Sequence, residues 1–290
     1  MNVVFNNFLI DQNAILISGG YDGNSRLTNI EVIGDSDTKL PPLPEGNSAH
    51  SMVITNNNEL MILGGNCDDE KQCYKLVNGK WQKQNPLTQP RKWAVRIVMP
   101  NGIYCFGGEG NRCTSDFLPN GQNEWQTGPE VPWPGIDHGH GVAISVKELL
   151  LVGGVGTENK MLKFNIERQE WSEIGSLLQE RSSHSCFFYN ENVIVTGGFD
   201  GYKWLKSTEI IKLSNWTPKK AGDLNVQRSH HGMGIVDING KSKLIVFGGW
   251  NGSHLDSIEE WDEVTETWSM SNMKLSEPKN RFGYCQLPQS

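Results

Sequence analysis

Residues 248–268 read GGWNGSHLDSIEEWDEVTETW and show the unit from which the chain is built. A Gly-Gly pair ends the apolar run LIVF, and Trp261 and Trp268 follow, seven residues apart. Short runs of β-branched and aromatic residues that end at glycine are typical of buried strands. This stretch therefore predicts short strands joined by tight turns.

The same unit recurs six times along the 290 residues, with successive glycine pairs 43 to 51 residues apart. The pairs are Gly19-Gly20, Gly64-Gly65, Gly107-Gly108, Gly153-Gly154, Gly197-Gly198 and Gly248-Gly249. A tryptophan follows in five units, at Trp81, Trp125, Trp171, Trp216 and Trp268. The first unit is degenerate and has Lys39 or Leu40 at that position. A repeat of this length indicates a solenoid, a propeller or an array.

Each unit supplies four short strands with turn residues between them, and no stretch has a sustained helical periodicity. One such unit cannot bury both its faces, whereas packing units face to face around an axis buries them and leaves only short edges. We therefore predict an all-β fold: a single β-propeller domain, residues 1–290, with six blades of four antiparallel strands. We expect the recurring tryptophans to fill the space between adjacent blades.

The pattern resembles the Kelch repeat, in which a Gly-Gly pair is followed by an aromatic residue, six residues and a tryptophan. The segments GGYDGNSRLTNIE (residues 19–31) and GGFDGYKWLKSTE (residues 197–209) are among the closest to it. The resemblance covers nearly the whole chain and implies a Kelch β-propeller similar to that of BTB–Kelch ubiquitin-ligase adaptors. It implies a scaffold or substrate adaptor that makes protein–protein interactions, although these 290 residues contain no BTB or BACK segment.

Closure of the propeller requires the last segment of the chain to meet the first. Residues 281–288, RFGYCQLP, match the start of a blade. We predict that residues 284–288 form the innermost strand of the first blade, beside residues 15–18. Two alternatives are open: residues 3–10 could occupy the same slot, or a truncated seventh blade could be present.

The loop after each glycine pair and the segment before each first strand are expected to share one face of an antiparallel meander, and such loops are where rigid scaffolds place binding residues. Trp, Tyr and Arg, which are enriched at binding hot spots, gather in these segments together with several histidines. The predicted partner-binding residues are Tyr21, Arg91, Trp93, Trp133, His138, Arg181, Tyr202, Trp204, Arg228, His230, Trp250 and Arg281. The alternative is that the aromatic residues pack under their own loops and stiffen them.

Four of these arginines are also suggested by the resemblance. In the adaptor family this face captures short peptides, often through arginines near the channel mouth. The matching residues before the first strands are Arg91, Arg181, Arg228 and Arg281. The first and fourth units depart from the pattern, with Asn47 and Asp137.

Catalytic and metal-binding patterns are weak. His50, His140, His184 and His231 recur at one repeat position, and a repeated histidine at a strand start is more often a hydrogen-bonded structural residue than a metal ligand. Glu109, Asp137 and Asp200 could act as acid or base near His138, as in a sugar-modifying Kelch enzyme, but no spacing singles them out. No nucleophile, phosphate-binding or metalloprotease motif is present. We predict no enzyme activity and no metal or other cofactor.

The net charge of −7 comes without a basic face, so nucleic-acid binding is not expected. No apolar run reaches the roughly 18 residues needed to span a bilayer, so membrane insertion is not expected either. We predict a monomeric module that binds a protein or peptide partner. The alternatives are a small-ligand or sugar-modifying site at the channel mouth, or a secreted glycoprotein.

The compartment depends on the cysteines and on possible glycosylation. Cys67 with Cys73, and Cys105 with Cys113, could each bridge a hairpin or remain free thiols. The Asn251-Gly252-Ser253 sequon could be glycosylated if the protein were secreted. We expect a cytoplasmic protein, with an extracellular one as the alternative.

Overall fold

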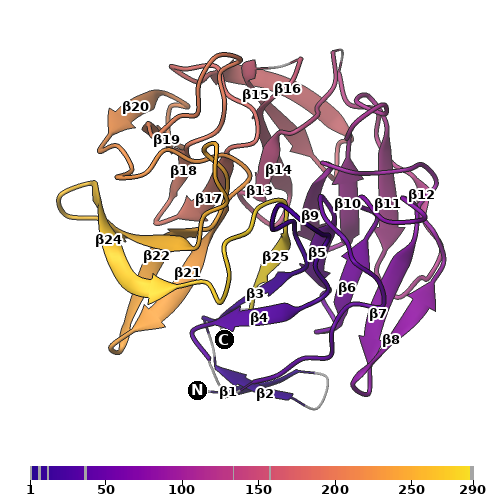
Figure 1. Ribbon diagram of the computed structural model, residues 1–290. Coiled ribbons are helices and arrows are strands. Elements are labelled where there is room, and N and C mark those ends of the chain that lie inside the picture. The colour runs from indigo at the N-terminus through magenta and orange to yellow at the C-terminus, as the bar shows by residue number, and fades with distance from the viewer. Residues whose placement is uncertain are drawn as a thin grey trace.

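The computed structural model describes residues 2–5, 8–11, 13–35, 38–132, 134–156 and 158–287, with side chains from residue 13 onward. This part of the chain consists of strands, turns and loops, and it contains no helix that could cross a membrane. Six antiparallel sheets stand as blades around a central axis, which confirms the predicted six-bladed β-propeller (Figure 1).

The blades follow the chain, except that the first is completed from the C-terminal end. Blade 1 contains β25 (Gly283–Gln286), β3 (Ile15–Ser18) and β4 (Ile30–Ile33). Blade 2 contains β5 (Ser51–Ile54), β6 (Leu60–Leu63), β7 (Cys73–Val77) and β8 (Lys80–Gln84). Blade 3 contains β9 (Val95–Met99), β10 (Gly102–Phe106), β11 (Ser115–Pro119) and β12 (Gln126–Thr127).

The remaining three blades are built in the same order. Blade 4 contains β13 (His140–Ala143), β14 (Glu148–Gly154), β15 (Glu158–Asn165) and β16 (Glu170–Ser176). Blade 5 contains β17 (Ser185–Tyr189), β18 (Asn192–Thr196), β19 (Thr208–Lys212) and β20 (Pro218–Ala221). Blade 6 contains β21 (Gly232–Ile238), β22 (Lys241–Phe247), β23 (Ser257–Asp262) and β24 (Thr267–Lys274).

The first strand of every blade lies beside the axis, and the later strands follow outward as an antiparallel meander (Figure 1). The six inner strands are β25, β5, β9, β13, β17 and β21. Cross-strand pairs fix the register of the outer strands: Trp261 lies opposite Trp268 and Phe164 opposite Trp171. The aromatic spacing seen in the sequence is thus the hairpin register of two blades.

The core consists of six apolar clusters, each between two neighbouring blades. The repeat tryptophans belong to them: Trp81, Trp125, Trp171, Trp216 and Trp268 each pack between their own blade and the preceding one. The expectation that they fill the space between blades is therefore confirmed.

The glycine pairs bring neighbouring blades into close contact. Gly64 and Gly65 have φ of +57° and +106°, values that side-chain-bearing residues rarely adopt. A Cβ on Gly64 would collide with the carbonyl oxygen of Arg91, to which Gly65 N–H donates at 2.8 Å. Glycine is required here because the loop and the segment that enters the next blade pass backbone to backbone.

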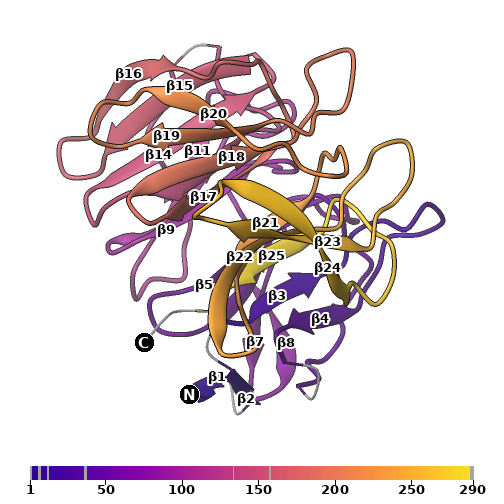
Figure 2. The same ribbon diagram turned by 90° about the vertical axis from the view of Figure 1, so that its left-hand side faces the viewer.

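The C-terminal strand closes the ring as predicted. β25 pairs antiparallel with β3, and Tyr284 lies opposite Ile17. The strand covers residues 283–286, and residue 288 of the predicted span lies outside the described residues. The alternative for residues 3–10 is wrong, because β1 (Asn2–Phe5) and β2 (Phe8–Asp11) form a separate hairpin outside the ring (Figure 2). Among the described residues there is no seventh blade.

Blade 1 departs from the prediction of four strands per blade. Its described residues form three strands, and the described stretch 38–47 contains none. This stretch carries Pro41, Pro42 and Pro44, which lack the N–H needed to join a strand ladder. Leu40 and Leu43 nevertheless remain buried in the cluster between blades 1 and 2, so the segment packs without pairing.

Candidate functional site

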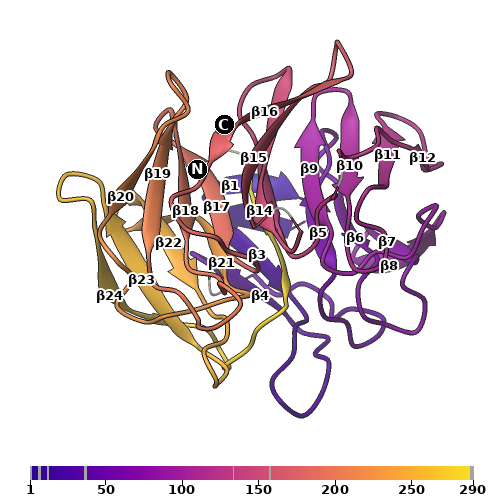
Figure 3. The ribbon, with the colours of Figure 1, turned by 90° about the horizontal axis from the view of Figure 1, so that it is seen from above.

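One face of the propeller, the loop face, carries the loops after the glycine pairs and the segments before the inner strands. Isolated backbone bridges join the two sets, for example Phe199 with Ser182 and Trp250 with Ser229. The prediction that both sets share one face is therefore confirmed. Turns such as those of β9–β10 and β15–β16 project from the opposite side, the turn face (Figure 3).

A ring of six residues, one entering each blade, surrounds the axis on the loop face. All have positive φ, between 52° and 63°. The members are Ala49, Trp93, His138, Ser183, His230 and Arg281. Five backbone hydrogen bonds of 2.6–3.4 Å run from one member to the next: Ala49 N to Arg281 O, Trp93 N to Ala49 O, Ser183 N to His138 O, His230 N to Ser183 O, and Arg281 N to His230 O. The ring fixes where these side chains begin.

Four predicted residues meet at the centre of this ring and form the axial cluster: Trp93, His138, His230 and Arg281. The Trp93 ring stacks on His138 with centroids 4.5 Å apart and lies 4.7 Å from His230. The Arg281 guanidinium lies over the Trp93 ring at 5.3 Å. Trp93 enters blade 3, yet its partners enter blades 4, 6 and 1, so its indole extends across the axis.

A second group, the aromatic crescent, runs over blades 5, 6 and 1. It contains Tyr202, Trp204, Trp250, His254 and Tyr21. His254 lies between Trp250 and Tyr21, with ring centroids 4.7 and 5.7 Å away. Trp204 lies against Gly252 in the next blade's loop, and Tyr202 is 95% exposed. The contacts of His254 with Tyr21 and of Trp204 with Gly252 therefore cross between neighbouring loops, whereas Trp250 packs on His254 and the Tyr21 hydroxyl donates to Gly23 within their own loops.

Two other aromatic residues occur in the same segments of the sequence, Trp133 and Phe199. Trp133 lies outside the described residues. Phe199, which was not predicted, packs against Trp204 with centroids 6.3 Å apart. It directly follows a glycine pair, as Tyr21 and Trp250 do, so aligning the repeats at that position would have found it.

Three of the predicted arginines are not on the surface: Arg91, Arg181 and Arg228 are 2, 1 and 0% exposed. Each guanidinium donates to a carboxylate on the third strand of the blade that it enters, and to the carbonyl oxygen of that blade's first paired glycine. The sets are Arg91 with Asp116 and Gly107, Arg181 with Glu209 and Gly197, and Arg228 with Glu259 and Gly248. These guanidinium groups fasten the entering segment to its own blade and present no group to a partner.

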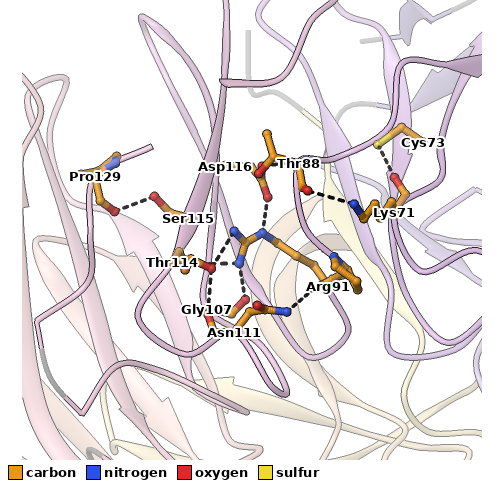
Figure 4. A network of polar contacts seen from close by, with 11 residues as sticks. Lys71, Cys73, Thr88, Arg91, Gly107, Asn111, Thr114, Ser115, Asp116 and Pro129 are labelled. Atoms are coloured by element: carbon orange, nitrogen blue, oxygen red, sulfur yellow. Dashed lines mark hydrogen bonds and ion pairs between the residues drawn. The ribbon is translucent and has the colours of Figure 1, made fainter. Parts of the chain in front are cut away.

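Figure 4 shows this arrangement around Arg91, whose guanidinium points at Asp116, Thr114 and the carbonyl of Gly107. In blade 6 the corresponding bonds from Arg228 to Glu259 and Gly248 measure 2.9 and 2.8 Å. A buried charge of this kind is tolerated because it is both paired and hydrogen-bonded.

The prediction that Arg281 is equivalent to these three arginines is wrong, because Arg281 lies two residues later in the repeat. The residue whose carbonyl accepts from the second paired glycine is Arg91, Arg181 or Arg228 in three blades, and Asn47, Ile136 or Lys279 in the others. Lys279 is fully buried and pairs with Glu31 at 3.0 Å, so it takes the arginine position before blade 1. Arg281 lies two residues later, in the ring, and is exposed.

The recurring histidines lie just below the ring. His50, His184 and His231 follow ring residues directly, whereas His140 lies one position further along. Nε2 of His50 is 2.7 Å from Ser18 Oγ, and Nε2 of His231 is 3.0 Å from Thr196 Oγ1. Burial lowers the pKa of His50 and of His184 to about 3. Among the described residues, no group of three or more His, Cys, Asp or Glu side chains is arranged to hold a metal ion.

The carboxylates considered for catalysis do not converge. Asp137 is buried and lies 2.7 Å from Nδ1 of His138, whereas Glu109 pairs with Lys92 at 3.1 Å. Asp200 accepts the N–H of Tyr202 and so closes its own loop. All six cysteines are free, and burial raises the pKa of Cys67 to about 11 and of Cys73 to about 12.

Comparison with known proteins agrees with this architecture. Residues 101–287 match the KLHDC2/KLHL20/DRC7 Kelch-repeats domain family. Kelch-like protein 41b of Danio rerio is 23% identical over 252 residues, or 76% of this chain and 40% of its own length. Kelch repeat protein M-T8 of Myxoma virus (strain Lausanne) is 25% identical over 73% of this chain and 33% of its own length.

The Host cell factor of Drosophila melanogaster is 24% identical over 85% of this chain but only 20% of its own length. The chain thus spans less than half of these relatives. The family match covers more than half of the chain, and six Gly-Gly repeats build its six blades. This chain belongs to the Kelch-repeat β-propeller family.

Proposed function

We propose that this propeller is a non-catalytic interaction module that binds a peptide or protein partner across its loop face. The observation that carries the proposal is the gathering of aromatic side chains from blades 5, 6 and 1 next to the axial cluster. Clustered Trp, Tyr and Arg side chains are the groups that supply most binding energy at protein interfaces. The proposed contact residues are Tyr21, Trp93, His138, Tyr202, Trp204, His230, Trp250 and Arg281.

The backbone is built to present these groups rigidly. The ring bonds and the buried arginine pairs hold the segments before the inner strands, while the side chains of the crescent remain partly open. A preorganised aromatic surface loses little conformational entropy when a partner binds. Because the relatives are longer proteins, we infer that the module recruits its partner to an activity carried elsewhere, as a substrate adaptor would.

The test compares partner capture by the wild type, by a loop-face triple variant and by a turn-face control. The triple variant is Tyr202→Ala, Trp250→Ala and Arg281→Ala. The control is Val264→Ala, because Val264 is 89% exposed in the β23–β24 turn. Proteins captured from lysate of the source organism are quantified by mass spectrometry, and thermal melts verify that each variant folds.

We expect proteins that the wild type and Val264→Ala retain equally and that the triple variant loses at least tenfold. Retention of the same partners by a folded triple variant would place binding elsewhere on the molecule. Loss with Val264→Ala alone would move the binding surface to the turn face.

A further inference from the structure

The central channel holds two cavities, and the larger one contains none of the residues proposed to contact a partner on the loop face. One of about 90 Å³ lies under the axial cluster and is lined by Trp93 and the histidines below the ring. The other, of about 340 Å³, lies further along the inner strands toward the turn face. Arg96 on β9 and His140 on β13 line both, so these two side chains lie between the cavities.

The larger cavity has the composition of a small-molecule site. Its walls are mainly apolar and include Met52, Ile97, Val142, Phe187 and Met233. Polar groups converge at the end where Arg96, His140 and Tyr284 lie. Ligand pockets in proteins typically occupy about 300–1,000 Å³ and combine an apolar lining with a few placed polar groups.

Arg96 brings a positive charge into this channel without a carboxylate to balance it. Its Nη2 donates to the carbonyl oxygen of Tyr284 at 3.0 Å, and its guanidinium carbon lies 4.6 Å from the centre of the Tyr284 ring. None of the described ion pairs includes Arg96, and no Asp or Glu is among the described residues lining either cavity. A guanidinium has five N–H donors and no acceptor, so this end of the cavity is rich in donors.

His140 brings no negative charge that would balance Arg96. Burial and the charge of Arg96 lower the pKa of His140 well below its ordinary value, so the imidazole is neutral. Its Nδ1 lies 3.3 Å from Cys186 N and 3.2 Å from Cys186 Sγ. Its Nε2 lies 2.9 Å from the Tyr284 hydroxyl.

Nη1 of Arg96 lies 3.4 Å from Nε2 of His140, which is long for a hydrogen bond. The five N–H donors of the guanidinium are therefore only partly used, and an acceptor placed beside Arg96 and the Tyr284 hydroxyl would bond to both. An anionic oxygen is the strongest such acceptor, because hydrogen bonds to charged groups are about twice as strong as neutral ones.

We propose that the channel binds a small amphipathic organic anion, with its charged group on Arg96 and the Tyr284 hydroxyl and its apolar body between the inner strands. The ligand reaches the cavity from the turn face, where the exposed Ala143 lies at its rim. The site is separate from the partner surface on the loop face, so either proposal can fail without the other.

The test uses octanoate as the anion, octanol as the neutral molecule with the same chain, and acetate as the charged group alone. Binding to the whole chain is measured by calorimetry and by NMR titration at millimolar ligand. The variants are Arg96→Gln, which removes the charge, and Ala143→Trp, which obstructs the rim. Arg168→Gln is the matched control, because Arg168 is exposed in the β15–β16 turn on the same face.

We expect saturable octanoate binding that Arg96→Gln weakens at least tenfold and Arg168→Gln leaves unchanged. Octanol should bind more weakly to the wild type and change less than threefold in Arg96→Gln, whereas Ala143→Trp should weaken both ligands. Three results would overturn the proposal: octanoate and octanol binding alike, acetate binding as tightly as octanoate, or octanoate binding that a folded Ala143→Trp variant retains in full. Absence of saturable octanoate binding would overturn it as well.

Discussion

The loop face has two halves that share one backbone frame and differ at one variable position. The residue after the glycine pair is aromatic in blades 5, 6 and 1, as Phe199, Trp250 and Tyr21, but is Asn66, Glu109 or Val155 in blades 2, 3 and 4. The frame is the same in both halves, since Asn66 bridges to Ser48 just as Trp250 bridges to Ser229. The contrast shows that glycine pairs and buried polar contacts determine the backbone frame. The residue that follows each glycine pair is not constrained by this frame, and it determines whether the surface is aromatic or polar.

The second half also differs in charge. The loop after Gly64-Gly65 reads NCDDEK, and the Asp68 side chain is 91% exposed. Burial and the nearby Glu45 carboxylate raise the pKa of Tyr74 to about 12, as expected where the local potential is negative. Under the proposed function, the aromatic half would anchor the partner, and the acidic half would steer a partner of positive charge toward it.

The largest expected effect is the difference in stability lost when a buried arginine of the frame and an exposed arginine of the surface are each replaced by alanine. Arg228→Ala leaves Glu259 as an unpaired buried charge, so we expect it to lower the free energy of unfolding by about 3–5 kcal/mol. Arg281→Ala removes only an exposed side chain and its stacking on Trp93, and should cost about 1 kcal/mol or less. Urea unfolding of both variants measures the difference.

An equal cost for the two arginines would contradict the division into frame and surface. A double variant, Arg228→Met with Glu259→Met, provides the control. Because it removes both charges and keeps much of the buried volume, it should recover a large part of the loss. Failure to recover would mean that the arginine acts mainly through its bonds to the glycine carbonyl.

The second-largest effect concerns the buried histidines that lie below the ring, under both halves of the loop face. The pKa of His184 is about 3 in the folded protein but about 6.5 in the unfolded chain, so the unfolded state binds the proton more readily at mildly acidic pH. Stability is therefore retained above pH 6.5 and is lost as the pH falls toward 3. From pH 7 to pH 5, this one histidine should lower the free energy of unfolding by about 2 kcal/mol.

The check is the difference between urea unfolding free energies at pH 7 and pH 5. His184→Gln should show a loss smaller than that of the wild type by this amount, because glutamine does not titrate. His254→Gln is the control, because His254 is only partly buried in the aromatic crescent. An identical loss in the wild type and in His184→Gln would mean that His184 is not held neutral in the folded state.

The repeat could be predicted from the sequence because the backbone requires particular residue types at the same position in each blade. The positive φ of the glycine pairs and the space between blades each admit few residue types, so Gly-Gly and Trp recur. The closing strand was predictable for the same reason. The missing strand of blade 1 was not, although Pro41, Pro42 and Pro44 were visible as the signal against it.

The site was harder to predict because burial decides which arginines can contact a partner. Arg228 and Arg281 are both arginines just before an inner strand, yet only Arg228 meets a carboxylate in the third strand of its blade. Loops of different length separate Asp116, Glu209 and Glu259 from their glycine pairs, and this hid the partner position. The reach of Trp93 across the axis depends on its φ of +63°, which the sequence does not reveal.

The smallest expected effect tests the acidic half. Asp68 lies 4.0 Å from Arg26 and is almost fully exposed, so Asp68→Asn should change the free energy of unfolding by less than about 0.5 kcal/mol. Its effect should appear instead in the rate at which a captured partner associates, because exposed charges act mainly on encounter. Stopped-flow measurements at low and high salt would show a slower association for Asp68→Asn at low salt only, since exposed charges are screened at high ionic strength. A rate that is unchanged at low salt would restrict recognition to the aromatic half, and a faster rate would mean that the partner meets this surface with negative charge.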